Sequence, residues 1–195
     1  MSKIHNFFLR LSNKKVLLIL FILVVLLVII PDFIKVPVGP LKFEEYSHGI
    51  KMIDMTTNYS PSTVYNMVEN YGAKARNYYI YVMEPFDVLV PAIMGLFLAG
   101  TITLLFKKAN KHKLVLLLQV IPLLGWVFDY LENIGVITIL VNYPHKLITV
   151  VKAANLFTTA KGIFDTAGIC IVCIGLILWV YDKTLRPRHQ NKTVT

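Results

Sequence analysis

The sequence alternates long apolar runs with shorter polar segments. A helix needs about 20 predominantly apolar residues to cross the hydrocarbon core of a bilayer. Runs that approach or exceed this length occupy about residues 14–32, 85–106, 114–141 and 160–182. Because only helices and closed barrels satisfy the backbone in lipid, these runs predict four transmembrane helices. The expected fold is therefore an all-α four-transmembrane-helix bundle, forming a single integral membrane domain over residues 1–195.

The first apolar run has a basic flank but no cleavage site. Lys14 and Lys15 precede it, as in a secretory signal, whereas the segment that begins at Pro31 offers no small residues for cleavage. We interpret this run as a signal anchor. Ahead of it, apolar residues at helical spacing predict either a short helix lying in the membrane interface or a disordered leader. These residues are Ile4, Phe7, Phe8 and Leu11.

The distribution of basic residues predicts the orientation. Twelve of the 20 Lys and Arg lie in segments that the four spans place on one side, namely Lys3, Arg10, Lys14, Lys15, Lys107, Lys108, Lys111, Lys113, Lys183, Arg186, Arg188 and Lys192. The positive-inside rule makes this side cytoplasmic, so both termini, including the tail 183–195, are expected there and the protein in the plasma membrane. The net charge of +9 then reflects topology and attraction to anionic membrane lipid. Nucleic acid is not an expected partner, because the basic residues are split among short segments without a binding motif.

Residues 33–84 form the long outer loop of this topology. The stretch Val36-Pro-Val-Gly-Pro40 is too rich in proline for a helix and is expected to be extended. Ser60 followed by Pro61 has the pattern of an N-cap and a first helical residue. Residues 73–83 are helical in composition and lead into the second span. The loop is therefore expected to be partly helical.

Ionisable and amide side chains occur inside the spans. Asp129, Glu132 and Asn133 follow i, i+3, i+4 spacing, which puts them on one helix face. A charged group at a helix centre costs about 2.5–3.5 kcal/mol on insertion scales, so this face is expected to look into the bundle or a water-filled pocket. Other helices deliver polar groups to a similar depth, namely Asp87, Lys161, Asp165 and, if Pro85 does not spoil the register, Arg76 and Tyr79.

We expect these groups to line an outward-facing, carboxylate-rich pocket that binds or processes a small polar or lipid-headgroup ligand. The candidate catalytic residues are Asp129, Glu132 and Lys161. The candidate ligand-binding residues are Arg76, Tyr79, Asp87, Asn133 and Asp165. Lys161 and Arg76 would keep carboxylates charged or meet an anionic headgroup.

Two matters stay open at this point. The polar groups could instead only hold helices or the subunits of a homo-oligomer together, in a structural or assembly protein. The pattern does not decide whether the protein is an enzyme, and it identifies no cofactor or metal, although carboxylate oxygens suit a hard cation.

The two cysteines form the motif Cys170-Ile-Val-Cys173 in the fourth span. This motif resembles the active-site CIVC of the vitamin K epoxide reductase family, which are four-helix membrane proteins. The resemblance implies a membrane thiol oxidoreductase, although that family relays electrons through further loop cysteines, so this chain would need an external donor. Helical geometry turns both cysteines off the polar face of the span. The alternative is that they are small apolar packing residues.

A second resemblance is carried by Tyr71-Gly72, Arg76, Tyr79, Asp87, Pro91, Asp129-Tyr-Leu-Glu-Asn133, Tyr143-Pro144 and Lys161. In these positions the chain resembles a group of uncharacterised bacterial four-helix integral membrane proteins. The resemblance implies the four-helix fold and no particular activity.

Overall fold

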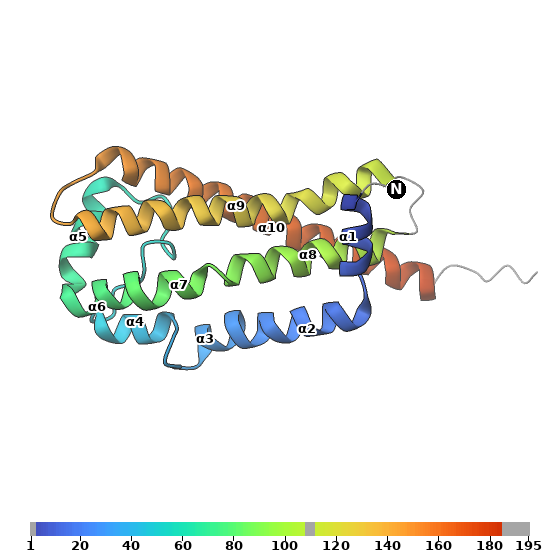
Figure 1. Cartoon of the computed structure of the whole chain (residues 1–195), viewed down its shortest axis with the longest axis horizontal. Coiled ribbons are helices and arrows are strands. Elements are labelled where there is room, and N and C mark those ends of the chain that lie inside the picture. The colour runs from blue at the N-terminus through green and yellow to red at the C-terminus, as the bar shows by residue number, and fades with distance from the viewer. Residues whose placement is uncertain (1–2, 108–111, 185–195) are drawn as a thin grey trace, which may run out of the picture.

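The computed structural model describes residues 3–107 and 112–184. Within these residues all regular structure is helical, and four segments are long and apolar enough to span a membrane: Lys14–Phe33, Gly72–Phe106, Lys113–Asn142 and Ile148–Thr184. Figure 1 shows these segments running along one common axis. The predicted all-α four-helix fold is confirmed. The basic residues Lys108, Lys111, Arg186, Arg188 and Lys192, and the side chain of Ile4, lie outside the described part.

The first span is preceded by the short helix α1 (Lys3–Leu11), which lies across the bundle axis in Figure 1. Phe8 and Leu11 are buried in a small apolar cluster with Ala99 of the second span, so the predicted short helix is present. The span itself consists of α2 (Lys14–Val24), the π turn η1 (Val25–Ile29) and α3 (Ile30–Phe33). It packs along the second span, where the rings of Phe21 and Phe97 lie 5.9 Å apart.

The second span begins at Gly72 rather than near residue 85. It consists of α6 (Gly72–Tyr78), the π turn η2 (Tyr79–Met83), α7 (Glu84–Asp87) and α8 (Val90–Phe106). Pro85 and Pro91 lack the backbone N–H that would continue the helical hydrogen bonds. The π turn lies just before Pro85, and the helix is interrupted at residues 88–89, just before Pro91. The register therefore changes twice along this span.

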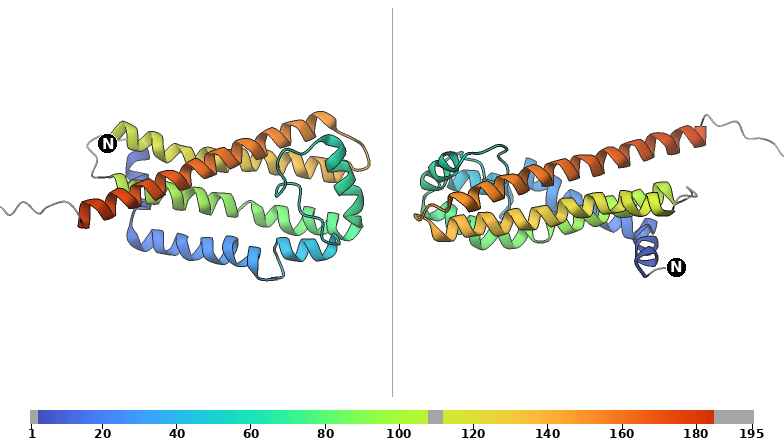
Figure 2. Two further views of the ribbon diagram at one scale, coloured as in Figure 1. Left: turned by 180° about the vertical axis from the view of Figure 1, so that it is seen from behind. Right: turned by 90° about the horizontal axis from the view of Figure 1, so that it is seen from above.

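The third and fourth spans are α9 (His112–Asn142) and α10 (Ile148–Thr184), which form the most extensive helix pair. The fourth helix begins twelve residues before the expected position 160. Small residues allow close approach: a Cβ added at Gly135 would lie 3.0 Å from that of Ala154. Such small-residue contacts are the usual means of packing membrane helices. In the left view of Figure 2, α10 crosses in front of the other spans as it runs the full length of the bundle.

Residues 34–71 fold over one end of the bundle, and we call them the cap. The cap contains α4 (Pro40–Tyr46) and α5 (Pro61–Asn70), and the connection between them turns back toward the spans (Figures 1 and 2). Ser60 is the N-cap of α5, as predicted, and its hydroxyl accepts a hydrogen bond from the Thr63 N–H at 3.1 Å. The expectation of an extended segment through Pro40 fails at its end, because this proline occupies the first turn of α4.

The cap shares an apolar core with the spans. Its buried residues pack with residues of α9 and α10 in one cluster that includes Phe43, Ile53, Val64, Val68, Val136, Ile139, Val151 and Ala154. The cap is therefore a folded part of the domain rather than a surface loop. We refer below to the capped end of the bundle and to the opposite, uncapped end.

Candidate functional site

The centre of the site is an ion-paired triad between α9 and α10. The Lys161 ammonium pairs with Glu132 Oε2 and lies 3.4 Å from Asp129 Oδ2. The Glu132 side chain is 0% exposed, and those of Asp129 and Lys161 are 13% and 16% exposed. The predicted face of the third span therefore does look into the bundle, and its charged partner is the lysine of the fourth span.

The triad is connected to the cap through Thr158. Its hydroxyl donates a hydrogen bond to Glu132 Oε1 at 2.5 Å and lies 3.1 Å from the Tyr59 hydroxyl. Because a hydroxyl has only one hydrogen, Tyr59 is the donor to Thr158. Burial raises the pKa of Tyr59 to about 12, so this hydroxyl keeps its proton to a higher pH than an ordinary tyrosine. Sequence reasoning missed Tyr59, whose position in the cap gave no indication of this contact.

The second span contributes Asp87 at the end of α7. The Asn133 amide donates a hydrogen bond to Asp87 Oδ2 at 2.9 Å, so two of the predicted residues meet directly. The helix is interrupted immediately afterwards, and the Tyr130 hydroxyl donates to the Val88 carbonyl oxygen at 2.5 Å. This hydrogen bond supplies a side-chain donor for a backbone carbonyl at the interruption.

Glu84 is a buried acid that sequence reasoning missed. It is only 4% exposed, and its Oε2 has no hydrogen-bond partner within the described residues. Glu84 is close enough to interact electrostatically with Asp54, Asp87, Glu132 and Asp129. The π turn η2 inserts an extra residue before α7, so that both Met83 and Glu84 are buried. In the sequence, the position of Glu84 directly before Pro85 was the available indication that its side chain turns inward.

Asp54 brings a further carboxyl group from the cap. The Tyr79 hydroxyl donates a hydrogen bond to Asp54 Oδ1, which ties the cap to the second span. Asp54 also interacts electrostatically with Glu84, Asp87 and the triad. We define the acidic cluster as the carboxyl groups of Asp54, Glu84, Asp87, Asp129 and Glu132 together with Lys161. Among the described residues, Lys161 is the one lysine that pairs with these carboxylates.

Asp165 lies beside this cluster rather than within it. Its carboxylate fits against Gly125 of α9, where an added Cβ would lie 2.1 Å from Asp165 Oδ1. Among the described residues, Lys161 forms its ion pairs with Glu132 and Asp129 and not with Asp165. The absence of a side chain at Gly125 therefore makes room for this half-buried carboxyl group.

Arg76 does not join Asp87, contrary to the expected helical alignment. Its guanidinium donates to the Val68 carbonyl oxygen at 2.9 Å and lies 4.7 Å from the centre of the Tyr143 ring. The π turn between Arg76 and Asp87 changes the register on which the alignment depended. Arg76 instead holds the end of α5 against the connection between α9 and α10.

The cysteines lie apart from the acidic cluster. Cys170 and Cys173 are free thiols that are exposed on the apolar surface of α10. Their predicted position off the polar face is confirmed, but they are not packed within the bundle. Their exposure on the apolar surface separates the thiols from the ion-paired triad.

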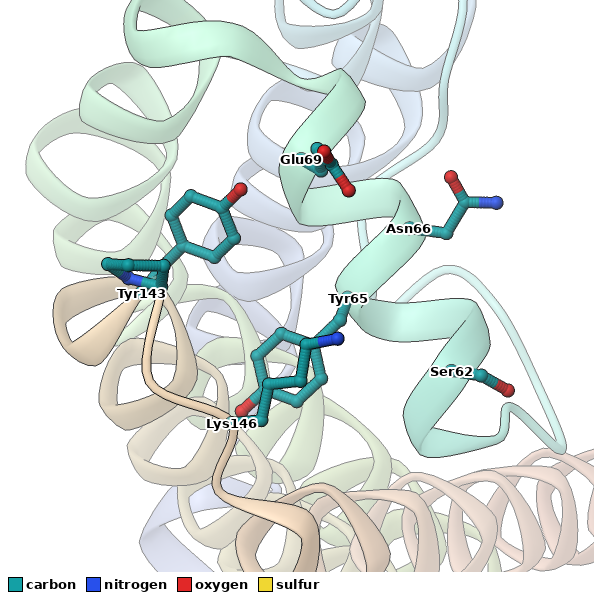
Figure 3. A pocket seen from close by; sticks show the side chains of 7 residues that line it. Ser62, Tyr65, Asn66, Glu69, Tyr143 and Lys146 are labelled. Atoms are coloured by element: carbon teal, nitrogen blue, oxygen red, sulfur yellow. The ribbon is translucent and has the colours of Figure 1, made fainter.

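A separate hollow of about 390 Å³ opens at the capped end between α5 and the connection from α9 to α10. Figure 3 shows Ser62, Tyr65, Asn66 and Glu69 along α5, with Tyr143 and Lys146 in the neighbouring connection. The Tyr65 hydroxyl accepts a hydrogen bond from the Leu147 N–H at 2.5 Å. This hollow involves none of the side chains of the acidic cluster.

Within the described residues, no group of three or more His, Cys, Asp or Glu is placed so that it could hold a metal ion. The carboxyl groups are thus close enough to influence one another without forming a preformed metal cage.

These features define the class as a polytopic membrane protein with a buried, capped acidic cluster. No protein family, curated protein or solved structure matches the chain. The chemistry of the site is therefore the basis for its function.

Proposed function

We propose that the protein resides in the plasma membrane and that its acidic cluster binds or processes a small polar ligand or a lipid headgroup at the outer leaflet. Both termini would be cytoplasmic and the cap would be outside. The distribution of Lys and Arg supports this orientation, because the described residues Lys14, Lys15, Lys107, Lys113 and Lys183 lie at the helix ends of the uncapped end.

The observation that carries the proposal is the surplus of buried and half-buried carboxyl groups. The acidic cluster sets five of them against Lys161, and neither Glu84 Oε2 nor Asp129 Oδ1 has a hydrogen-bond partner within the described residues. Buried polar atoms are normally paired, and unpaired ones are costly. Interhelical polar contacts contribute only about 0.6 kcal/mol on average in a membrane protein, so helix adhesion alone is a poor reason to keep this surplus.

The interruption of the second span supports the same proposal. Broken transmembrane helices are a recurrent way of building ligand and ion sites near the middle of a membrane. Here the interruption at residues 88–89 directly follows Asp87, and Glu84 lies one turn before it. In this proposal, Asp129 and Glu132 are the acid/base or ligand groups, Lys161 keeps them ionised, and Asn133 orients Asp87.

One observation favours the alternative, in which the polar groups only hold the helices together. Lys161, Glu132, Thr158 and Tyr59 form a continuous chain of contacts that joins α9, α10 and the cap. Such a chain would stabilise the fold even without a ligand.

The experiment that separates the two functions is native mass spectrometry of the full-length protein released from its own membrane. We expect the wild type to retain a lipid or small molecule. The double variant Glu132→Gln with Lys161→Met removes both charges of the central pair while largely preserving side-chain volume. Deleting both partners avoids the cost of about 3–5 kcal/mol that follows when one buried charge is left alone.

We expect the double variant to fold but to lose the retained molecule. The matched control is Glu69→Gln with Lys152→Met, which changes the same residue types at exposed positions. If the double variant keeps its retained molecule and changes only in thermal stability, the acidic cluster is structural and the proposed function is wrong.

A further inference from the structure

The charges of the acidic cluster restrict the ligands that it could accept. Five buried or half-buried carboxyl groups and one lysine leave a marked excess of acid in a site that is only partly open to water. An uncompensated buried carboxylate is strongly unfavourable, so a ligand that brings positive charge stabilises this arrangement. A ligand that brings negative charge adds to the electrostatic repulsion among these carboxylates.

Two buried carboxylate oxygens of the cluster have no hydrogen-bond donor among the described residues. Glu84 is 4% exposed, it interacts electrostatically with the other four carboxyl groups, and its Oε2 accepts no hydrogen bond from any described residue. Asp129 keeps Lys161 on Oδ2, whereas its Oδ1 is buried without a partner in the part of the chain that the structure describes. Both atoms are acceptors that lack donors. The missing component is therefore a hydrogen-bond donor that carries positive charge.

The cations predicted for an anionic headgroup are already engaged. Lys161 is held by Glu132 and Asp129, and Arg76 is held by the Val68 carbonyl oxygen and the Tyr143 ring. Lys161 is therefore already paired with carboxylates of the acidic cluster, and Arg76 makes its contacts outside that cluster. A bare metal ion is also a poor fit, because no metal-binding group of three ligands exists among the described residues.

We infer that the acidic cluster accepts the ammonium group of a primary amine, with Glu84 and Asp129 as its acceptors. This inference rests on the proposed function and narrows it to one class of ligand. An alkylammonium has three N–H donors and a single charge, which matches two unpartnered carboxylate oxygens within a larger field of negative charge. The amine could be free in solution or be part of an aminophospholipid headgroup, since both present the same group.

The first test uses ethylammonium chloride as a soluble probe. Full-length protein in detergent, freed of retained lipid, is titrated at constant ionic strength while its Tm and its calorimetric binding are measured. We expect ethylammonium to bind and to raise the Tm, and sodium chloride to do neither. Glu84→Gln should weaken binding about tenfold or more, since a charge-assisted hydrogen bond is lost. Should this variant not fold, Asp129→Asn provides the same comparison.

The matched control is Glu69→Gln, which alters an exposed carboxyl group at the separate hollow and should leave binding unchanged. If Glu69→Gln abolishes binding while Glu84→Gln does not, the amine occupies the hollow and the inference is wrong. An absence of ethylammonium binding, together with a Tm that rises on acidification, would show that protons alone balance the cluster, and would overturn the inference as well.

The second test distinguishes the two sources of amine. The protein is placed in nanodiscs of phosphatidylcholine containing either phosphatidylethanolamine or phosphatidylglycerol, and the lipid retained after extraction is identified by native mass spectrometry. Selective retention of phosphatidylethanolamine, displaced by ethylammonium, indicates a lipid headgroup. Ethylammonium binding without lipid retention indicates a soluble amine. Selective retention of phosphatidylglycerol, lost in the Glu132→Gln, Lys161→Met variant, would preserve the proposed function but refute the amine.

Discussion

The Tyr59 hydroxyl of the cap lies 3.1 Å from the Thr158 hydroxyl of α10, and Thr158 in turn donates to the buried Glu132. This contact joins a segment between the first two spans to the centre of the acidic cluster. We expect Tyr59→Phe to lower the free energy of unfolding by about 1 kcal/mol, because one buried hydrogen bond is lost without a change in shape. Denaturant unfolding measures the change, and Tyr81→Phe, at a residue that is 73% exposed, is the control.

The same variant should change the response of the protein to alkaline pH. Burial raises the pKa of Tyr59 to about 12 in the folded state, above the value of about 10 for an unfolded tyrosine. The folded state therefore holds this proton more tightly, and its stabilising effect is fully present below pH 10. It is lost as the pH rises toward 12. We expect the stability difference between wild type and Tyr59→Phe to shrink over this interval. A difference that stays constant would contradict the assigned environment of Tyr59.

Gly125 should be intolerant of a side chain because of Asp165. An added Cβ would lie 2.1 Å from Asp165 Oδ1, so the carboxylate must move in Gly125→Ala. We expect this variant to lose about 1–3 kcal/mol of stability, as overpacked sites do. Adding Asp165→Ala removes the clash, so the double variant should lose less than the sum of the single changes.

Gly162→Ala is the natural comparison, since a Cβ there would meet no atom within 4 Å. Thermal unfolding in detergent, followed by intrinsic fluorescence, measures all four variants. Additive losses in the double variant would show that Gly125 and Asp165 do not interact.

Arg76 should stabilise the cap rather than the acidic cluster. Arg76→Met removes a charged donor to the Val68 carbonyl oxygen and the contact with Tyr143. We expect a loss of about 1–3 kcal/mol and faster amide hydrogen exchange in α5. Arg76→Lys should restore little, because an ammonium lacks the planar fork of a guanidinium. Lys152→Met, at an exposed position of α10, should leave exchange in α5 unchanged. Unaltered exchange in Arg76→Met would mean that Arg76 has no part in holding α5.

The proposed orientation predicts which positions an impermeant thiol reagent reaches in intact cells. Single cysteines are placed at the exposed positions Lys51, Lys107 and His145, in a chain that carries Cys170→Ala and Cys173→Ala. We expect labelling at 51 and 145, and labelling at 107 only after the membrane is permeabilised. The reverse pattern would place the cap in the cytoplasm.

The shared face of Asp129, Glu132 and Asn133 could be predicted because it depends only on the regular period of one helix. Glu132 and Asn133 are buried, and Asp129 is largely buried beside Lys161, as that period required. The four spans were predictable for a related reason, since the bilayer imposes their length and apolar composition.

The remaining members of the acidic cluster depend on features that a regular period does not contain. Glu84 is turned inward by a π turn, which shifts the register between Arg76 and Asp87. Asp54 and Tyr59 reach the cluster only because the cap folds back onto the spans, and that fold is determined by contacts between residues far apart in the sequence. Charge and polarity in a segment between spans do not by themselves show that its side chains are buried.

Because the cap and the spans share one apolar core, the cap cannot finish folding until the later spans have been synthesised. Phe43, Ile53 and Val64 leave the ribosome well before Val136 and Val151, against whose cluster they are buried. The cap therefore has no complete core until the third and fourth spans have entered the membrane. During that interval its apolar residues are accessible to chaperones and proteases. A chain that stops after the third span lacks α10, and with it the contribution of Val151 to the shared core.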